Sequence, residues 1–335
     1  MLESLLCFEP HLLPKVWGGR RLSQLNRLLP EDQSYGESWE ISDHASHSSV
    51  ISHGTFAGRT LRNLMQSHRS SLLGDDSEAD VFPLLVKFLD ADDWLSVQVH
   101  PDDENVKTLL PGEGGKTEAW LVLDAEPESK IFAGLKSGVG EKEIRDALKK
   151  GNVEECLCTF TPKAGDCLFL PAGTVHAVGG GVLMAEVQQT SDATFRLFDW
   201  NRGGRELHLE QSMQAIDWNQ GEVKPISIPD FESTGGEHQQ ISLVDCPYFK
   251  MQYRRGSTPF TIGESGQAEL LIVLQGEGMI GDQRLSRGTC WLKPACVDTI
   301  ECAPVNGMGM LHVIIPNNGG AGFEPASERN WPVAK

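Results

Sequence analysis

The sequence lacks three features that would place the protein in a membrane or on nucleic acid. No apolar run approaches the ~18 residues that a membrane-spanning helix needs. No basic tract is present, and 47 acidic against 29 basic residues give a net charge of -18, which disfavours nucleic acid and anionic membrane surfaces. The N-terminus has no positive region ahead of its apolar residues, so we expect no signal peptide. We therefore expect a protein that binds neither nucleic acid nor membrane.

The sequence also has no CxxC pair among its eight cysteines. Cys156 and Cys158 form a CxC within a strand-like run, and the other cysteines are scattered. Scattered thiols favour a reducing compartment over a disulfide framework. We therefore expect a cytoplasmic protein, and we expect it to be a monomer or a weak homodimer.

Glycine and proline are spread along the chain and separate many short, strand-like apolar runs. The 35 glycines and 18 prolines gather in no single linker, which indicates frequent turns. Helical spacing of apolar residues is confined to residues 59–73, 141–150 and 208–218. The pattern predicts a mainly β protein with a few peripheral helices.

Two segments of the sequence share a pattern of turns and apolar residues. Residues 162–176, PKAGDCLFLPAGTVH, follow the pattern G(x)5PxG(x)2H, which resembles the second motif of the cupin superfamily of jelly-roll barrels. Residues 276–300 have a similar outline without the histidine. We therefore predict two cupin-type β-barrels. Residues 1–220 form a catalytic, metal-binding domain with helical elaboration, 221–237 a connector, and 238–335 a C-terminal cupin-like domain without metal ligands.

Because side chains alternate along a strand, several residues that could bind a metal ion are expected on the same face of their strand. In LSVQVHPDDE, Ser96, Gln98 and His100 share a face, and in GGKTEAW the same holds for Lys116 and Glu118. His176 follows the tight Pro-x-Gly turn that would place it on the inner face of a neighbouring strand. Two imidazoles, a carboxylate and an amide oxygen suit Zn²⁺, and Fe²⁺ or Mn²⁺ would also accept them.

Each of these residues also has an ordinary structural interpretation. A lone strand histidine is more often hydrogen-bonded than metal-bound. Lys116 follows two glycines, as solvated turn residues do, and Arg196 could form an ion pair with Asp192 or Asp199. The acids at positions 102–104 are interpreted as the N-cap and first turn of a short helix rather than as ligands.

Taken in order, four motifs resemble type I phosphomannose isomerase, the mannose-6-phosphate isomerase family. They are LSVQVHPDDE, GKTEAW, LPAGTVHAVG and AEVQQTSDATFRLFDW. PKVWGGRRL, GESWEISDH and FPLLVKFLDA extend the resemblance over nearly the whole chain. It is closest to the short bacterial form, which lacks the large helical insertion of the long form.

The resemblance implies an aldose–ketose isomerase that contains one zinc ion per chain, with other divalent ions as alternatives. The implied zinc ligands are Gln98, His100, Glu118 and His176. The implied catalytic residues are Arg196 and Lys116. The implied substrate-binding residues are Ser96 and Glu37, with Glu40 as a nearby alternative to Glu37.

The implied reaction interconverts mannose 6-phosphate and fructose 6-phosphate through a cis-enediol. It needs a base near C1 and C2, stabilisation of the developing oxyanion, and a grip on the phosphate. A metal and a cation can share the second task. Lys87 and Arg202 are further candidates for the phosphate, because a protein of charge -18 must hold an anionic substrate with a local group of cations. Lys116, a metal-bound water or a glutamate could each be the base.

Two alternatives are compatible with the same residues. One is a non-catalytic isomerase homologue that binds a sugar phosphate. The other is a cupin iron oxygenase that uses His100, Glu118 and His176 with open positions for O₂. An oxygenase gives no reason for Lys116 and Arg196 beside the ligands.

Overall fold

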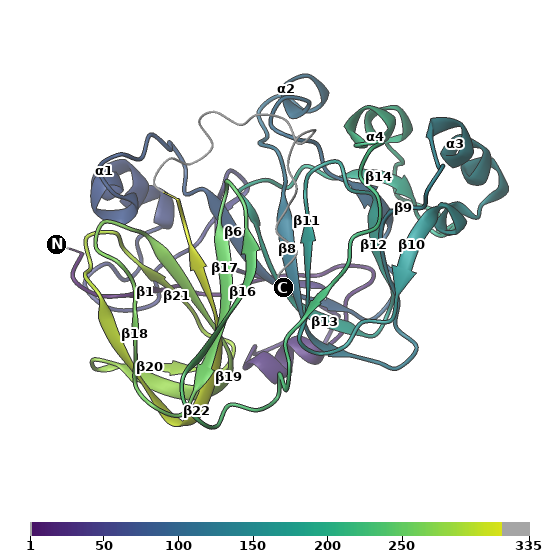
Figure 1. Ribbon diagram of the computed structural model, residues 1–335. Helices are drawn as coiled ribbons and strands as arrows, with labels where there is room; N and C mark the ends of the chain where they lie inside the picture. The colour runs from purple at the N-terminus through teal and green to yellow at the C-terminus, as the bar shows by residue number, and fades with distance from the viewer. Residues whose placement is uncertain (1, 317–335) are drawn as a thin grey trace.

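The computed structural model describes residues 2–316, and it confirms the mainly β prediction. Three large sheets are stacked (Figure 1). A five-stranded and a seven-stranded sheet face each other and form the N-terminal lobe. The eight-stranded sheet, which we call the C-terminal lobe (residues 239–314 with the strand at 6–7), packs on the other side of the seven-stranded sheet. Residues 317–335 of the predicted C-terminal domain lie outside the described residues, and the proposed domain boundaries stay a prediction.

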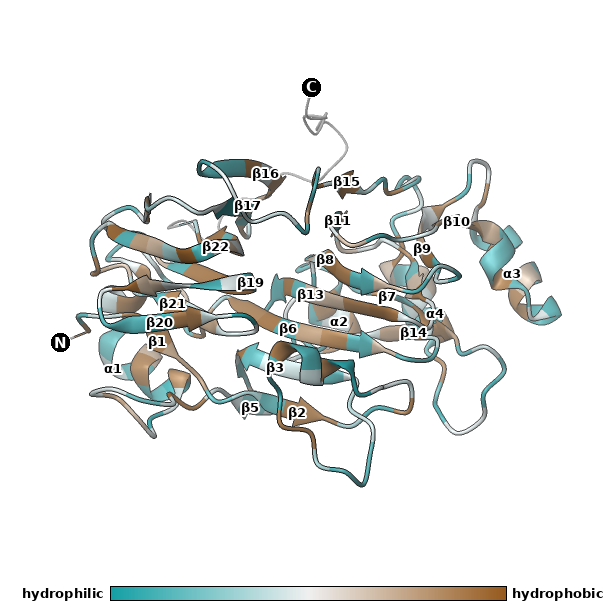
Figure 2. Ribbon diagram, turned by 90° about the horizontal axis from the view of Figure 1, so that it is seen from below, coloured by the Kyte–Doolittle hydropathy of each residue, from teal (hydrophilic) through white to brown (hydrophobic). Residues whose placement is uncertain are grey.

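The seven-stranded sheet is antiparallel, and its central strands are buried on both faces. Its order is β15 (Ile226–Ser227), β11 (Asp166–Leu170), β8 (Glu118–Ala125), β13 (Val182–Gln189), β6 (Leu84–Ala91), β3 (Glu37–Ile41) and β2 (His11–Leu13). In β13, Val182 and Met184 face the five-stranded sheet, and Leu183 and Ala185 face the C-terminal lobe. A strand covered on both sides is a nearly continuous apolar run, which Figure 2 shows for β13 and β6.

The five-stranded sheet has one face toward the seven-stranded sheet and one toward helices. Its order is β10 (Leu157–Phe160), β9 (Ile131–Leu135), β12 (His176–Val178), β7 (Val97–Val99) and β14 (Phe195–Phe198). Val97 and Val99 pack with α3 (Glu141–Lys150), η2 (Val153–Cys156) and α4 (Leu209–Ala215) in one apolar cluster. By alternation, Gln98 points the other way, into the space between the two sheets of the N-terminal lobe.

The C-terminal lobe includes a strand from the start of the chain. Its main path is β1 (Leu6–Cys7), β21 (Cys290–Lys293), β19 (Glu269–Ile280), β22 (Ile300–Ile314), β17 (Lys250–Gly256) and β16 (Gln239–Asp245). β18 (Phe260–Ile262) pairs with β22, and β20 (Gln283–Ser286) pairs with β19. The hairpin β4 (Asp43–His44) and β5 (His47–Ser48) stands apart. The prediction of two barrels is not confirmed, because the described strands pair in open sheets and none of these sheets closes on itself.

The three predicted helices are present. α1 (Leu61–Leu73) begins at a capping box formed by Thr60 and Asn63 and ends at Gly74. α3 ends at Gly151, whose φ of 74° is the left-handed conformation that glycine adopts most easily. The short α2 (Val106–Leu109) and η1 (Arg21–Leu25) complete the set. Within residues 2–316, none of the helices has both the length and the apolar character to cross a membrane.

Candidate active site

The four predicted metal ligands come from both sheets of the N-terminal lobe and meet between them. Gln98 is the central residue of β7, and its Cα partner on β12 is His176. His100 directly follows β7, and Glu118 begins β8 in the facing sheet. The strands therefore bring residues 98, 100, 118 and 176 to one point, as their alternation predicts.

Three of these side chains offer ligand atoms within 4.8 Å of one another, namely His100, Glu118 and His176. Glu118 Oε1 lies 3.6 Å from His100 Nε2 and 3.5 Å from His176 Nε2. Gln98 Nε2 lies 3.2 Å from His176 Nε2, so the Gln98 amide borders the same centre. All four predicted ligands are therefore adjacent.

The imidazole tautomers are fixed by backbone carbonyl groups. His100 Nδ1 donates to the carbonyl of Ala193 at 2.8 Å, and His176 Nδ1 donates to that of Thr174 at 2.9 Å. A carbonyl oxygen can only accept, so the proton is on Nδ1 and the Nε2 lone pair points to the centre. Such outer partners orient histidines that bind metals.

The donor set fits a divalent cation. Burial lowers the pKa of His176 to about 3, and burial with the charge of Lys116 lowers that of His100, so both rings are neutral. Burial alone would raise the pKa of Glu118, but the charge of Lys116 holds it well below its usual range. Glu118 Oε1 is buried without a hydrogen-bond donor. Neutral imidazoles and an unsatisfied buried carboxylate oxygen form a site that a divalent cation would complete.

Lys116 is buried beside this centre. Its side chain is only 6% exposed, and its Nζ lies 2.9 Å from Glu118 Oε2 and 3.2 Å from His100 Nε2. The interpretation of Lys116 as a solvated turn residue is therefore wrong. Burial would lower the pKa of Lys116, but the charges of Glu118 and Glu186 raise it. Lys116 is consequently a fixed cation.

Sequence reasoning missed Glu186. Its Oε1 lies 3.5 Å from Lys87 Nζ and 3.9 Å from Lys116 Nζ, and its Oε2 accepts from Trp120 Nε1 at 3.0 Å. Burial and the charge of Glu118 raise the pKa of Glu186. The sequence offered one signal for this residue. It is a carboxyl group within the apolar run GVLMAEV, and by strand alternation it shares a face with Met184.

Lys87 extends the buried charges toward β3. It is the Cα partner of both Glu186 and Trp39, and its ammonium lies 5.0 Å from the centre of the Trp39 ring. Glu37 follows, paired with Lys15 at 2.9 Å and accepting from Trp39 Nε1 at 2.7 Å. Burial alone would raise the pKa of Glu37, but Lys87 and Lys15 lower it to about 2.

Glu40 lies on the opposite face of β3. It pairs with Arg27 at 2.6 Å and accepts from Ser38. Since alternate residues of a strand face opposite sides, Glu37 and not Glu40 shares the face of Lys87. Glu118, Lys116, Glu186, Lys87 and Glu37 thus form a buried row of alternating charge, which we call the charge row.

Arg196 lies next to the metal ligands but makes neither predicted ion pair. It is the Cα partner of Gln98 on β14, and its Nη1 donates to the carbonyl of Glu206 at 2.7 Å. Its Nε is buried without a hydrogen-bond partner. Asp199 instead pairs with Arg202 and Arg205, so the interpretation of Arg196 as a structural ion pair is wrong.

Ser96 and Arg202 differ in how far they reach the centre. Ser96 is buried, and its hydroxyl lies 3.5 Å from Gln98 Oε1. Arg202 donates to Asp93 at 3.0 Å and to the carbonyl of Trp94 at 2.6 Å, and it pairs with Asp199. The guanidinium of Arg202 is therefore already held by two carboxylates.

The acids after His100 have two different functions. Asp102 Oδ1 accepts from the backbone of Glu104 and Asn105 ahead of α2, as a capping residue does. α2 begins at Val106 with Asn105 as its N-cap, so residues 102–104 do not form its first turn, contrary to the prediction. Asp103 bonds elsewhere. It accepts from Gly115 N at 3.0 Å, across a loop.

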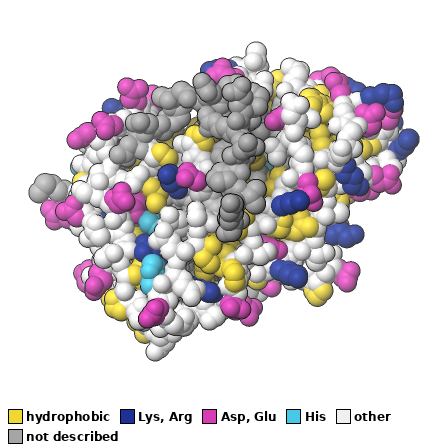
Figure 3. Space-filling model, viewed as in Figure 1, with side chains coloured by type: hydrophobic (Ala, Val, Ile, Leu, Met, Phe, Trp, Pro, Cys, Tyr) yellow, Lys and Arg dark blue, Asp and Glu magenta, His cyan; other side chains and the backbone are white. Residues whose placement is uncertain are grey.

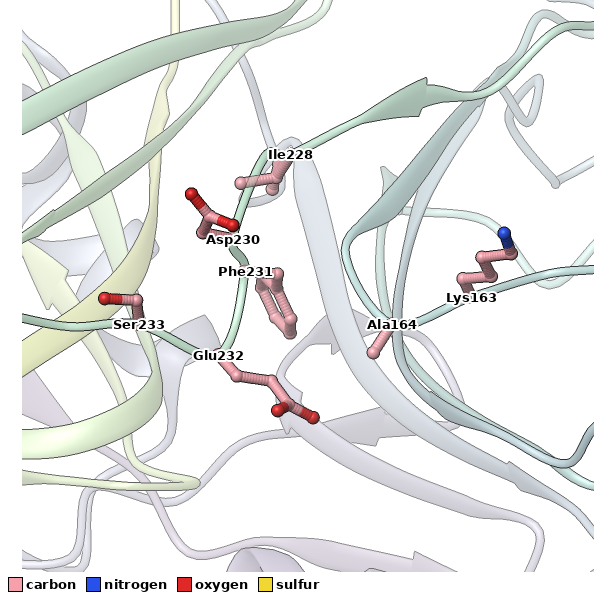
Figure 4. A pocket seen from close by; sticks show the side chains of 7 residues that line it. All are labelled: Lys163, Ala164, Ile228, Asp230, Phe231, Glu232 and Ser233. Atoms are coloured by element: carbon pink, nitrogen blue, oxygen red, sulfur yellow. The ribbon is translucent and has the colours of Figure 1, made fainter.

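A surface hollow of about 510 Å³ lies outside the charge row, where the turn before β11 meets the segment after β15 (Figure 4). Its lining residues are Lys163, Ala164, Ile228, Asp230, Phe231, Glu232 and Ser233. They include no member of the metal-type cluster found among the described residues. On the face shown in Figure 3, acidic and basic side chains are interspersed, and no extended basic patch is visible.

Comparison with known proteins relates the chain to one group of enzymes. Residues 6–128 match the family model described as phosphomannose isomerase type I, catalytic domain. The chain is 36% identical over 289 residues to mannose-6-phosphate isomerase ManA of Bacillus subtilis, covering 83% of this chain and 88% of that protein.

Solved structures show the same relationship. The crystal structure of the mannose 6-phosphate isomerase from Bacillus subtilis superposes with a TM-score of 0.81 at 27% identity, covering 93% of this chain and 99% of that one. A zinc-bound mannose 6-phosphate isomerase shares the fold with a TM-score of 0.72 at 16% identity, with 93% and 99% coverage.

Proposed function

The chain belongs to the type I phosphomannose isomerase family, and from that premise we propose that it is a metal-dependent aldose–ketose isomerase. It interconverts D-mannose 6-phosphate and D-fructose 6-phosphate through a cis-enediol. The observation that carries the proposal is the convergence of His100, Glu118 and His176 within 4.8 Å, with the Lys116 ammonium 2.9 Å from the same carboxylate.

We propose that Gln98, His100, Glu118 and His176 hold one zinc ion per chain. Their nitrogen and oxygen donors suit Zn²⁺, and we expect other divalent ions to bind to the same donors more weakly. A bound divalent ion supplies Lewis acidity toward adjacent sugar oxygens and toward negative charge that develops on them. The tautomers of His100 and His176 support this assignment, because both Nε2 lone pairs point toward the centre.

We assign the proton transfer to Glu186 and the electrostatic task to Lys116. Isomerisation moves a proton between C2 and C1, and the carbonyl group shifts in the opposite direction as the hydroxyl proton passes between O2 and O1. A base needs a pKa close to the working pH, and burial raises that of Glu186. Lys116 is held as an ammonium group, which suits it to stabilise the developing oxyanion and not to accept the proton.

We propose Arg196 as the principal contact for the phosphate. Its planar guanidinium is suited to phosphate oxygens, and its buried Nε has no partner within the described residues. Lys87 is a second candidate and is partly neutralised by Glu186. Arg202 is a weaker candidate, because Asp93 and Asp199 already occupy its donors.

Ser96 and Glu37 complete the proposed substrate side. Ser96 lies beside Gln98, and Glu37 ends the charge row.

We also propose that residues 1–220 form the catalytic domain, with 221–237 as connector and 238–335 as the C-terminal domain. The eight unpaired cysteines support a cytoplasmic location, and we propose a monomer or a weak homodimer.

The proposal is tested by a coupled assay on mannose 6-phosphate. We expect turnover that a chelator abolishes and Zn²⁺ restores. Binding of mannose 6-phosphate without turnover would identify a non-catalytic homologue, and O₂ consumption with Fe²⁺ in the absence of isomerisation would identify an oxygenase. Either result would contradict the proposal.

A further inference from the structure

A tyrosine of the C-terminal lobe bonds to the loop that follows His100, and this loop in turn holds the segment that carries Lys116. Tyr248 lies on the turn between β16 and β17, which is closed by a 3.1 Å hydrogen bond from Cys246 N to the carbonyl of Phe249. From this turn, the Tyr248 hydroxyl donates to Asp103 Oδ2 at 2.6 Å, across 145 residues of sequence. Tyr248 therefore bonds a residue that lies three positions after the metal-ligand candidate His100.

Asp103 uses its other oxygen to hold the approach to Lys116. Asp103 Oδ1 accepts from Gly115 N at 3.0 Å and from Gln189 Nε2 at 3.1 Å. Gln189 in turn accepts from Thr117 N at 2.8 Å. One carboxylate thus joins Tyr248, Gly115 and Gln189.

The backbone on both sides of Lys116 depends on these acceptors. The N–H groups of three consecutive residues, 115, 116 and 117, donate to Asp103 Oδ1, the carbonyl of Pro101 and Gln189 Oε1. Two of the three acceptors are side chains joined at Asp103, and they replace the backbone partners that a regular strand would supply. The position of the Lys116 backbone therefore depends on how Asp103 is oriented.

Asp103 packs so closely against Gly115 that position 115 has no room for a side chain. A Cβ atom at Gly115 would lie 2.5 Å from Asp103 N and 2.6 Å from Asp103 Oδ1. A rotation of the Asp103 carboxylate would break its hydrogen bond to Gly115 N, directly before Lys116. The Lys116 ammonium has to stay 2.9 Å from Glu118 Oε2 and 3.2 Å from His100 Nε2 to keep the arrangement described above.

We propose that Tyr248 is a positioning residue for catalysis: its hydrogen bond to Asp103 orients the segment Gly115–Thr117 and thereby holds Lys116 at the active centre. The C-terminal lobe thus contributes to the reaction through this contact. The inference rests on the proposed function. It gives the lobe a role beyond covering the seven-stranded sheet.

The hydrogen bond between Tyr248 and Asp103 is suited to hold Asp103 in one orientation throughout the reaction. Burial and the hydrogen bond to Asp103 raise the pKa of the Tyr248 hydroxyl, so it remains a donor at any working pH. A hydrogen bond to a charged group is stronger than one between neutral groups. Its other end is fixed, because Tyr248 lies on a closed turn packed against the large core cluster.

The test compares Tyr248→Phe with Tyr253→Phe in the full-length, zinc-loaded chain. Tyr253 is a matched control, because its buried hydroxyl donates to Gln275 at 2.8 Å, next to the carbonyl of Phe231, and bonds to none of residues 115–117 within the described part of the chain. For Tyr248→Phe we expect kcat to fall roughly fivefold to tenfold, a part of what one hydrogen bond to a charged group can contribute. We expect KM and zinc content to change less than twofold, and Tyr253→Phe to retain wild-type kcat.

A second measurement does not depend on turnover. Hydrogen exchange of the amides at 115–117 should be faster in Tyr248→Phe than in wild type and unchanged in Tyr253→Phe. Wild-type kcat and wild-type exchange in a folded Tyr248→Phe protein would overturn the inference. An inactive wild-type enzyme would instead contradict the proposed function, and the exchange comparison would still decide whether Tyr248 holds this segment.

Discussion

At the scale of single residues, Glu186 gives the site a group that can move a proton. The other charged groups at the centre have fixed states, since Glu118 is held ionised and Lys116 is held protonated. Glu186 differs because burial and the neighbouring carboxylate raise its pKa. Of these three, it is the one whose charge can change during turnover.

We therefore predict that Glu186→Gln lowers kcat by roughly 10²- to 10⁴-fold, the range for loss of a general base. The amide keeps the shape and can still accept from Trp120 Nε1, so zinc content should stay normal. Turnover and exchange of the C2 proton with D₂O measure the loss.

Glu40→Gln is the matched control for this variant. It also removes a buried carboxylate, but one that pairs with Arg27 on the far face of β3. We expect lower stability with a nearly unchanged kcat of the folded enzyme. Equal kcat values for the two variants would mean that Glu186 has only a structural role.

At the scale of elements, cross-strand register builds the charge row. Lys87 on β6 is the partner of Glu186 on β13 and of Trp39 on β3, so three strands place their polar groups at one level. A shift of one residue in any of these strands would turn its polar group to the opposite face. Because folding shifts the pKa of a carboxyl group in this row, the stability of the sheet also depends on pH.

Glu37 provides the clearest case of this dependence. Its pKa is about 2 in the folded protein against an ordinary value of 4.5, so its contribution is complete above pH 4.5 and is lost as the pH falls toward 2. The full contribution is on the order of 3 kcal/mol. We predict that Glu37→Gln loses less free energy of unfolding than wild type between pH 6 and pH 3, as measured by urea titration. Parallel losses in both proteins would show that Glu37 is not held ionised.

Alternation within a strand could be predicted from the sequence, but the pairing of strands could not. The faces of Gln98, His100 and Glu118 follow from period-two spacing alone, and the structure brings them together. The partnership of Glu186 with Lys87 depends on β13 lying beside β6, almost 100 residues away in sequence. The hydrogen bond between Asp103 and Tyr248 could not be predicted for the same reason, because it joins residues far apart in sequence.

At the scale of the whole molecule, the active centre lies between two sheets and is supported by a third. The largest apolar cluster runs from the seven-stranded sheet into the C-terminal lobe. The two lobes therefore share one core, which local sequence patterns did not predict. Closed barrels were expected from motif resemblance, whereas the described strands form open, stacked sheets.

The central claim at this scale is that the N-terminal lobe holds one divalent ion between its two sheets, and metal analysis of His100→Ala tests it most directly. His53→Ala, which removes an exposed histidine, is the control. We predict about one zinc per chain in wild type and in His53→Ala, and loss of most of the zinc together with the isomerase activity in His100→Ala. Full zinc content in a folded His100→Ala protein would contradict the account.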